Sequence, residues 1–335
     1  MSGVSVPYHM RQNKAVERML FIDLLTRLNR EIPIGDYRYI SFGGAFLEDF
    51  KLIHSHFGNS RMTSIEQTEI ALKRQEFNLP LNCITALHRG SEQFVDEYQA
   101  DEPSIIWLDY TSPAKLRSQI QEVQALLPKL RNGDILKITL NANPSALRSG
   151  VHIIDGKREL IDDARKAQFD ELYTRLGDML PEGVSAGDME ATKFPIVLLK
   201  TMQFAINNAM EGRRVAEGVC YQPLSAFSYQ DGQQMFTLTG VLVTEADREA
   251  FLNKTGIDRW EHSCIDWGDP KKIAVPALTP REKLTIDRLL PDGETQQIQE
   301  KLGFYFGEDQ SDSIEAIENY RRYYRYYPNF QRVIF

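Results

Sequence analysis

Apolar residues follow two different periods along the chain, and the period changes from segment to segment. A stripe at three- to four-residue spacing predicts an amphipathic helix over residues 14–28, and its members are Val16, Leu20, Leu24 and Leu28. Near-continuous apolar or β-branched runs, typical of buried strands, lie at residues 37–42, 62–66, 81–87, 104–108 and 135–140. Helical patterns separate these runs. The alternation predicts a parallel sheet that is covered by helices on both faces.

The pattern changes after the fifth run. Residues 160–179 and 196–210 have helical spacing, which predicts a helical excursion at about 150–215. Two strand-like runs then follow at residues 226–229 and 235–243, on either side of Asp231-Gly232. An Asp-Gly pair between strand runs is a hairpin signal. We therefore expect an antiparallel hairpin to close the parallel sheet.

Paired glycines end the first strand. Gly43-Gly44 precede a helical pattern, and Glu66 ends the second strand roughly 20 residues later. Glycines let the backbone approach a ligand, and an acid after the second strand can accept both ribose hydroxyls. The layout predicts a nucleoside-cofactor site. Two simpler interpretations remain open, namely a tight strand-to-helix turn and an acid that the helix dipole favours.

A polar loop follows the fourth strand. Asp109-Tyr110-Thr111-Ser112-Pro113 begins at the carboxyl end of a buried strand, where α/β sheets bind ligands. Methyl transfer needs a positioned acceptor and sometimes a base, and Asp109, Tyr110 and His88 are the candidate catalytic residues. The alternative for Asp109 is to cap the following helix.

Two further polar groups are candidates for substrate binding. Asn141 and Asn143 end the fifth strand, where their amides could bind a polar acceptor or form a turn. Arg11, Asn13 and Lys14 precede the first helix, and they form either a lid over the site or a solvated helix start.

Composition narrows the class of protein. The chain has 335 residues, enough for one large domain and a smaller attached region, and its net charge of −8 argues against a protein that coats nucleic acid. The three cysteines fit no metal spacing, so we expect reduced thiols and no metal. The first residues lack a signal-peptide pattern and no apolar run is long enough to span a bilayer, so the prediction is a cytoplasmic protein with no membrane segment.

The C-terminal segment interleaves tyrosines and arginines over residues 320–327. Such rings can stack on bases while guanidinium groups neutralise phosphates, which would suit nucleic acid or a protein partner. Helical spacing places four tyrosines on one face, which is typical of a helix docked on its own protein; they are Tyr320, Tyr323, Tyr324 and Tyr327.

Over about residues 37–245 the chain resembles the class I S-adenosylmethionine-dependent methyltransferases. More narrowly, it is similar to a group of bacterial proteins described as putative O-methyltransferases. The shared sequences are Arg11-Gln12-Asn13-Lys14, Phe42-Gly43-Gly44, Ser64-Ile65-Glu66 and Trp107-Leu108-Asp109-Tyr110. The resemblance implies an α/β fold, a Rossmann-like sheet of five parallel strands and a terminal antiparallel hairpin, with helical additions. The implied domains are an N-terminal helical lead (1–35), a methyltransferase-like domain (36–245) and a helical appendage (246–335).

The resemblance also implies roles for single residues in binding S-adenosylmethionine. Gly43 and Gly44 match the turn at the methionine part, Glu66 the ribose-binding acid, and Gly90-Ser91 the adenine loop. Asp109 matches a position that meets the methionine part or the substrate. The chain departs from the pattern at Ser41, where the family commonly has an acid, and at Ala45, where it has a third glycine. The cofactor's ammonium group would then need Asp49 or Asp109.

These observations lead to one main functional hypothesis and two alternatives. The main hypothesis is S-adenosylmethionine-dependent methyl transfer to an unidentified acceptor. A binding or scaffolding protein without turnover is the first alternative, because Ser41 replaces the expected acid. The second is a nucleic-acid-modifying methyltransferase that uses the C-terminal helix. The loop at Asp109 is only loosely similar to the Asp-Pro-Pro-aromatic loop of amino-methylating enzymes, and no Pro-Cys nucleophile is present.

Overall fold

The computed structural model of the protein describes residues 11–147, 151–154, 157–160 and 163–328. Their contacts group them into two compact units. The first unit comprises Ile22–Ser228 and Gln233–Lys271, and the second comprises residues 11–21, Tyr229–Gly232 and residues 272–328. The two units combine segments that are far apart in the sequence. The division predicted from the sequence, at residues 36 and 246, stays a prediction.

Within the described residues, eight strands form one sheet in the order β10-β8-β9-β5-β4-β1-β2-β3. The strands are β1 (Arg38–Ser41), β2 (Met62–Glu66), β3 (Ile84–His88), β4 (Ser104–Asp109), β5 (Ile135–Asn141), β8 (Val219–Asp231), β9 (Gln233–Thr244) and β10 (Lys271–Ile273). Strands β1 to β5 pair in parallel, and β9 pairs with β5 antiparallel. Gly232, with φ of 101°, connects β8 to β9. The predicted α/β class, with five parallel strands and a closing hairpin, is confirmed.

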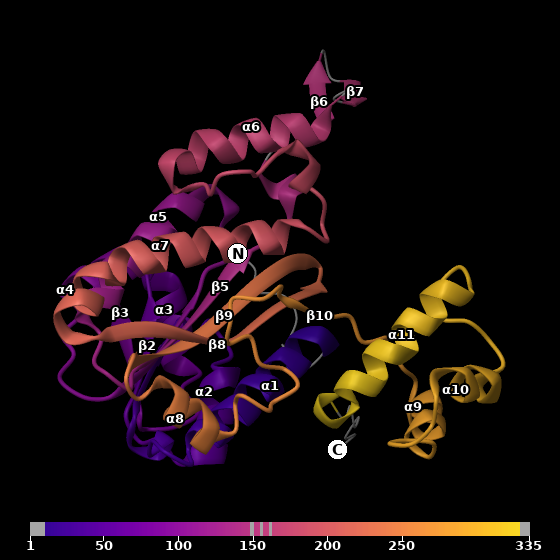
Figure 1. Cartoon of the computed structure of the whole chain (residues 1–335), viewed down its shortest axis with the longest axis horizontal. Helices are drawn as coiled ribbons and strands as arrows, with labels where there is room; N and C mark the ends of the chain where they lie inside the picture. Colours follow the sequence, from indigo (N-terminus) through magenta and orange to yellow (C-terminus); the bar gives the residue numbers. More distant parts are fainter. Residues whose placement is uncertain (1–10, 148–150, 155–156, 161–162, 329–335) are drawn as a thin grey trace. The chain divides into compact units, whose positions relative to one another are not determined.

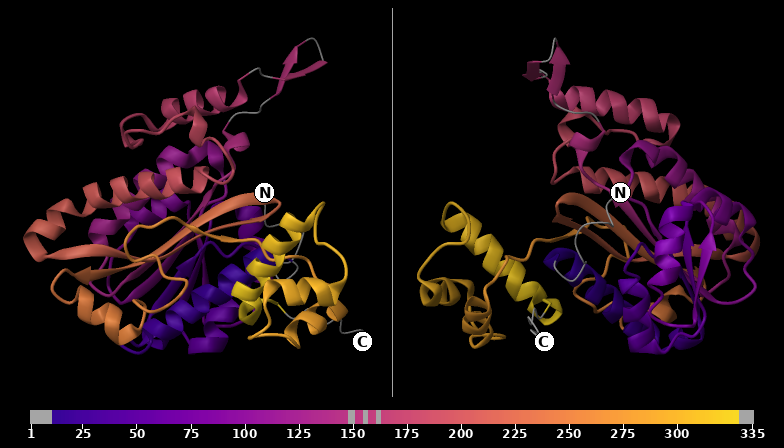
Figure 2. Two further views of the ribbon diagram at one scale, coloured as in Figure 1. Left: turned by 45° about the vertical axis from the view of Figure 1, so that its right-hand side comes forward. Right: turned by 180° about the vertical axis from the view of Figure 1, so that it is seen from behind.

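Helices connect the strands of the sheet, and further helices precede β1 and follow β10 in the chain (Figure 1). They are α1 (Gln12–Leu28), α2 (Glu48–Phe57), α3 (Glu69–Phe77), α4 (Ser91–Glu97), α5 (Leu116–Leu126), α6 (Ala164–Leu176), α7 (Phe194–Glu217), α8 (Arg248–Thr255), α9 (Pro280–Asp287), α10 (Thr295–Leu302) and α11 (Gln310–Tyr323). A small antiparallel hairpin, β6 (Val151–Ile154) and β7 (Lys157–Leu160), precedes α6. The helical excursion predicted at about 150–215 therefore begins with strands, and Figure 2 shows this hairpin beyond the end of α6.

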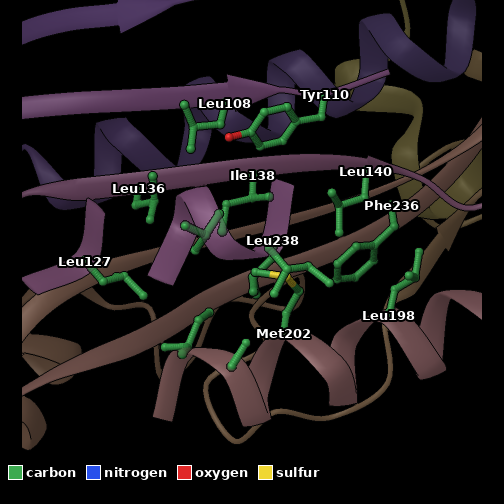
Figure 3. Close-up of a cluster of buried hydrophobic side chains, with 14 of the residues drawn as sticks. Leu108, Tyr110, Leu127, Leu136, Ile138, Leu140, Leu198, Met202, Phe236 and Leu238 are labelled. Carbon is green, nitrogen blue, oxygen red and sulfur yellow. The ribbon is translucent and has the colours of Figure 1, made fainter. Parts of the chain in front are cut away.

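One face of the sheet carries the main hydrophobic core. Side chains alternate between the faces of a strand, and on this face Leu136, Ile138 and Leu140 of β5 are buried. Leu198 and Met202 of α7 belong to the same cluster (Figure 3). Further members come from α4, α5 and α6. The carboxyl ends of the strands are therefore held by a continuous apolar layer on this side.

The opposite face has a polar row in its interior. Residues in register on neighbouring strands point to the same face, and one such row crosses five strands: Thr239, Lys137, Trp107, Ser41 and Ser64. All five are buried. The next row toward the carboxyl ends pairs Asp109 with Thr139 and Glu66 with His88. The polar row thus lies directly beneath the residues predicted to bind a cofactor.

The second unit is held together by hydrogen bonds between its three segments. Asn13 donates from Nδ2 to the Gln230 carbonyl at 3.0 Å and to Asp231 Oδ1 at 3.1 Å, and it accepts from the Val275 backbone N–H at 2.8 Å. Tyr320 donates to Asp287 at 2.7 Å, and Tyr327 donates to the Pro276 carbonyl at 3.1 Å. The C-terminal tyrosines therefore pack within their own unit.

Candidate functional site

The turn after β1 leaves no room for a side chain at Gly43. The Gly43 N–H donates to Ser64 Oγ at 3.1 Å. A Cβ atom at Gly43 would lie 2.2 Å from that oxygen and 2.3 Å from Leu47 Cδ2, which are distances that real Cβ atoms do not show. Gly44 has φ of 54°, and its carbonyl accepts from Gln75 Nε2 at 3.0 Å. Both glycines are therefore required by geometry.

Ser41, at the position where the sequence resemblance implies an acid, lies just before this turn. The residue is 1% exposed, and its hydroxyl oxygen is buried with no hydrogen-bond partner among the residues that the structure describes. Buried hydroxyls are normally hydrogen-bonded, because leaving one unsatisfied costs about 1–3 kcal/mol. The hydroxyl is thus available to a ligand at the turn.

Glu66 ends β2, two residues beyond the serine that holds the glycine turn. At about 3.3 Å per residue, it lies roughly 7 Å further along the strand than Ser64. Its Oε1 accepts from the Thr68 N–H at 2.9 Å and from Thr68 Oγ1 at 3.2 Å. In the described part of the chain Oε2 accepts no hydrogen bond, so one oxygen of this carboxylate is left for a ligand. The parallel register of β1 and β2 puts the Gly43–Gly44 turn and Glu66 at the same edge of the sheet.

Asp49 is buried on the first turn of α2 and is already engaged. It accepts a hydrogen bond from the Tyr39 hydroxyl at 2.7 Å, and the Tyr39 ring packs edge-on against Phe50 at 4.9 Å between centroids. Its role toward an ammonium group stays a prediction.

Asp109 and Tyr110 are adjacent in sequence but point to opposite faces of the sheet. Asp109 is half-buried at the carboxyl end of β4, beside Thr139. Tyr110 belongs to the apolar core (Figure 3), where its hydroxyl donates to Glu122 Oε2 of α5 at 2.6 Å. Burial, and then the negative charge of Glu122, raise the pKa of Tyr110 well above its ordinary value. The phenol is therefore neutral near neutral pH, which favours Asp109 over Tyr110 as a base.

Of the residues predicted at the end of β3, His88 is exposed, and Gly90 and Ser91 are half-buried. His88 lies beside Glu66 in the sheet, and its Nε2 is 3.0 Å from the Gln67 carbonyl. Gly90 precedes α4 with φ of −74°, and a Cβ there would come no closer than 3.6 Å to Gln67. Ser91 begins α4. Unlike Gly43, Gly90 is not required by local geometry.

The remaining predicted residues make turns or belong to the second unit. Asn141 Oδ1 accepts from the Asn143 N–H, and Asn143 Oδ1 accepts from the Ser145 N–H, both at 3.0 Å. Asn13 and Lys14 bind Asp231, with the Lys14 N–H 2.6 Å from Oδ2, and Arg11 precedes the same helix. Substrate binding by these five residues stays a prediction.

Sequence reasoning missed two residues that shape the turn, Ser64 and Gln75. Ser64 stands inside the Ser-Ile-Glu sequence, and its position two residues before Glu66 could have indicated its role. Gln75 is completely buried although it lies on a polar helix, and no pattern in the sequence marks it.

Comparison with known proteins gives one family and several similar folds. The model of a family described as putative O-methyltransferase matches residues 6–335. No curated protein matches the chain. The structure is similar to the plantazolicin methyltransferase BpumL solved with a triazolic desmethylPZN analog and SAH (12% identity, 68% of this chain and 85% of that chain, TM-score 0.38). Two others are the N-methyltransferase NodS of Bradyrhizobium japonicum WM9 (9%, 68% and 97%, TM-score 0.36) and cofactor-bound Rv0187 from MTB (13%, 71% and 82%, TM-score 0.37).

Proposed function

This chain belongs to the putative O-methyltransferase family, and we propose that it transfers the methyl group of S-adenosylmethionine to an acceptor oxygen. One observation carries the proposal. The Gly43–Ser64 hydrogen bond holds a turn without side chains against the strand that ends in Glu66. The Gly43–Gly44 backbone, the Ser41 hydroxyl and the Oε2 atom of Glu66 therefore lie at one edge of the sheet. In α/β proteins this is the edge that binds nucleotides.

The residues present fit this cofactor in three respects. Glu66 would accept hydrogen bonds from the ribose hydroxyls through Oε2. The Gly43–Gly44 backbone would lie against the methionine part, because the turn that follows β1 is at the edge of the sheet where α/β proteins bind nucleotides. The orphaned Ser41 hydroxyl would find its partner among the polar atoms of the same part. Gly90 and Ser91 would border the adenine, and Asp49 or Asp109 would neutralise the ammonium group.

When bound, the cofactor supplies an electrophilic methyl group on a sulfonium. The protein's task is then to hold the acceptor in line with that methyl group and to receive a proton. Asp109 is the carboxylate at the end of β4 that suits proton transfer. The acceptor would lie beyond it, near the loops that follow β4 and β5.

A binding protein without turnover is the second candidate function, and Ser41 is the observation that favours it. A serine cannot supply the charge that the family's usual acid offers to an ammonium group. A nucleic-acid acceptor contacted through the C-terminal helix has less support, because Tyr320, Tyr323 and Tyr327 are buried and cannot stack on bases. We also propose that a protein partner binds at this helix and that the protein is cytoplasmic. None of the helices in the described segments is long and apolar enough to cross a membrane.

Calorimetry with S-adenosylmethionine and S-adenosylhomocysteine tests the proposal. Binding of both, followed by transfer of a labelled methyl group to a component of a cell extract, is expected for an enzyme. Binding without transfer to protein, nucleic-acid or small-molecule fractions would favour the second candidate. The absence of binding to either compound would refute the cofactor assignment.

A further inference from the structure

Arg175, near the end of α6, connects two loops that belong to neighbouring strands. Its Nη1 donates to the Pro113 carbonyl and its Nη2 to the Leu147 carbonyl, each at 2.8 Å. Pro113 lies in the loop after β4 that begins at Asp109. Leu147 lies in the segment after β5, which follows Asn141 and contains Asn143. One guanidinium group therefore joins the two loops at the acceptor end of the proposed site.

The guanidinium group is itself held in place. Glu171, one turn earlier on α6, accepts from Arg175 Nε at 2.7 Å. Three of the donors on the planar fork are thus directed at fixed acceptors, and only arginine offers that geometry. The side chain is 20% exposed, so the bonds are partly shielded from water.

A second arginine makes the connection reciprocal. Arg117, on the first turn of α5, donates from Nη1 to the Arg175 carbonyl at 3.3 Å and to the Leu176 carbonyl at 2.7 Å. These are carbonyls at the C-terminal end of α6, which have no partner within the helix. Gln119 of α5 adds a bond to the Ser112 carbonyl at 2.9 Å. Helix α6 therefore binds the loop after β4 directly through Arg175, and helix α5 binds both α6 and this loop through Arg117 and Gln119.

We propose that Arg175 is a positioning residue that sets the distance between the Asp109 loop and the Asn141–Asn143 loop, and with it the width of the acceptor site. The inference rests on the proposed function, because only that function makes this end of the sheet an acceptor site. The chain leaves the sheet at Asn141, where β5 ends, and Leu147 lies in the segment that leads from there toward α6, so Arg175 connects α6 back to that segment. Acceptor contacts with α6 would consequently be transmitted to both loops.

The experiment compares four full-length variants by hydrogen exchange and by binding of S-adenosylhomocysteine. Arg175→Met removes both loop bonds, Arg175→Lys keeps the charge but not the fork, and Glu171→Gln keeps the arginine but weakens its orientation. Arg213→Met is the matched control. Arg213 also pairs with a glutamate one turn away on its helix, Glu217, and donates to a backbone carbonyl, that of Leu130 before β5.

We expect Arg175→Met to speed amide exchange in residues 110–116 and 141–147 by about tenfold or more, because local opening of both loops becomes easier. Arg175→Lys and Glu171→Gln should give smaller increases in the same peptides. Arg213→Met should leave these peptides unchanged. The dissociation constant of S-adenosylhomocysteine should stay within about threefold, because a change of that size is under 1 kcal/mol and Gly43 and Glu66 are untouched.

Other outcomes overturn the inference. Unchanged exchange in either loop would show that Arg175 does not hold it, and faster exchange throughout the sheet would show a general structural role. If Arg175→Met does not fold, amide exchange of residues 110–116 and 141–147 in the Arg175→Lys and Glu171→Gln variants decides whether Arg175 holds the loops. Failure of the wild-type protein to bind S-adenosylhomocysteine would count against the proposed function, while the exchange result would still decide whether Arg175 holds the two loops.

Discussion

The ammonium nitrogen of Lys137 lies 4.1 Å from the centroid of the Trp107 ring. Both side chains are on the face of the sheet opposite the main hydrophobic core, and Lys137 has no exposed surface there. The two residues are in register on β5 and β4, and Trp107 Nε1 donates to Thr139 Oγ1 at 2.8 Å. A cation over an indole face is worth about 2 kcal/mol when both are shielded from water. The contact fixes the indole directly beneath the row that contains Asp109.

Replacement of Lys137 by alanine should destabilise the protein strongly. We expect the free energy of unfolding to fall by roughly 3–5 kcal/mol, because the change opens a cavity and removes a buried charge from its contacts. Lys137→Met, which keeps most of the volume, should cost less. Urea unfolding followed by tryptophan emission measures both variants. Lys51→Ala, at an exposed lysine that pairs with Glu48, is the control, and an equal effect at both positions would contradict the prediction.

Gly43→Ala should damage both folding and binding. The added Cβ would clash with Ser64 Oγ and Leu47 Cδ2, and such overpacking costs about 1–3 kcal/mol. The turn must shift to relieve it, so binding of S-adenosylhomocysteine should weaken at least about tenfold. Gly212→Ala is the matched control, because nothing lies within 4 Å of a Cβ at that position in α7. Thermal unfolding and calorimetry report the two effects. Normal binding by Gly43→Ala would mean that the turn does not contact the cofactor.

Glu66→Gln should weaken cofactor binding without loss of stability. A hydrogen bond to a charged acceptor contributes about 1.5–3 kcal/mol, so the dissociation constant should rise at least about tenfold. Glu69→Gln on α3 removes a neighbouring exposed carboxylate, whose partner is Lys73 at 2.7 Å, and should leave binding unchanged. If both variants bind equally well, Glu66 is only a surface acid.

Asp134 should make stability depend on pH. Burial raises the pKa of its carboxyl from 3.8 to about 6, although the Arg131 and Ser104 backbone N–H groups donate to it. The folded pKa is above the unfolded one, so this group's stabilising contribution is full below pH about 4 and is lost as pH rises through about 6. A shift of this size corresponds to roughly 3 kcal/mol.

The measurement for Asp134 is the difference in unfolding free energy between wild type and Asp134→Asn. The unfolding free energy of the wild type, relative to that of Asp134→Asn, should fall as pH rises from about 4 to 6, and it should stay constant at higher pH. A change in the opposite direction would show that the two backbone donors outweigh burial.

Removal of the C-terminal helix should destabilise the second unit. Deleting residues 311–335 takes away the buried side chains of Tyr320, Tyr323 and Tyr327 and leaves an apolar surface that promotes aggregation. Light scattering and thermal unfolding of the shortened protein test this. Tyr320→Phe, which removes the bond to Asp287, should cost only about 1 kcal/mol. A shortened protein that stays soluble and stable but loses salt-dependent RNA binding would favour the nucleic-acid hypothesis.

Much of the sheet could be predicted because its strands are nearly continuous apolar runs. The positions of Gly43, just after β1, and of Glu66, at the end of β2, also predicted that both residues lie at one edge of the sheet. Asp155-Gly156 is a hairpin signal of the same kind as Asp231-Gly232. The helical spacing that follows it obscured the β6–β7 hairpin.

The parts of the site that sequence could not predict depend on contacts between distant segments. The polar row arises only when five strands align, so neither the burial of Lys137 nor the isolation of the Ser41 hydroxyl is visible in a local pattern. Gln75 and Arg175 likewise look like ordinary surface residues of polar helices. Tyr110 was grouped with Asp109 because they are adjacent, whereas alternation along the strand sends them to opposite faces.

The Asn13–Val275 hydrogen bond joins residues 262 positions apart, which affects when the second unit can form during synthesis. At the usual 5–20 residues per second, a ribosome needs about 13–52 s to add that length of chain. The start of α1 therefore emerges long before its last partner exists. The first unit is also completed late, because its last residue, Lys271, precedes Val275 by only four positions. The second unit gains its last segment only from Lys272 onward, so residues 11–21 wait longest for the residues that they bind in this unit.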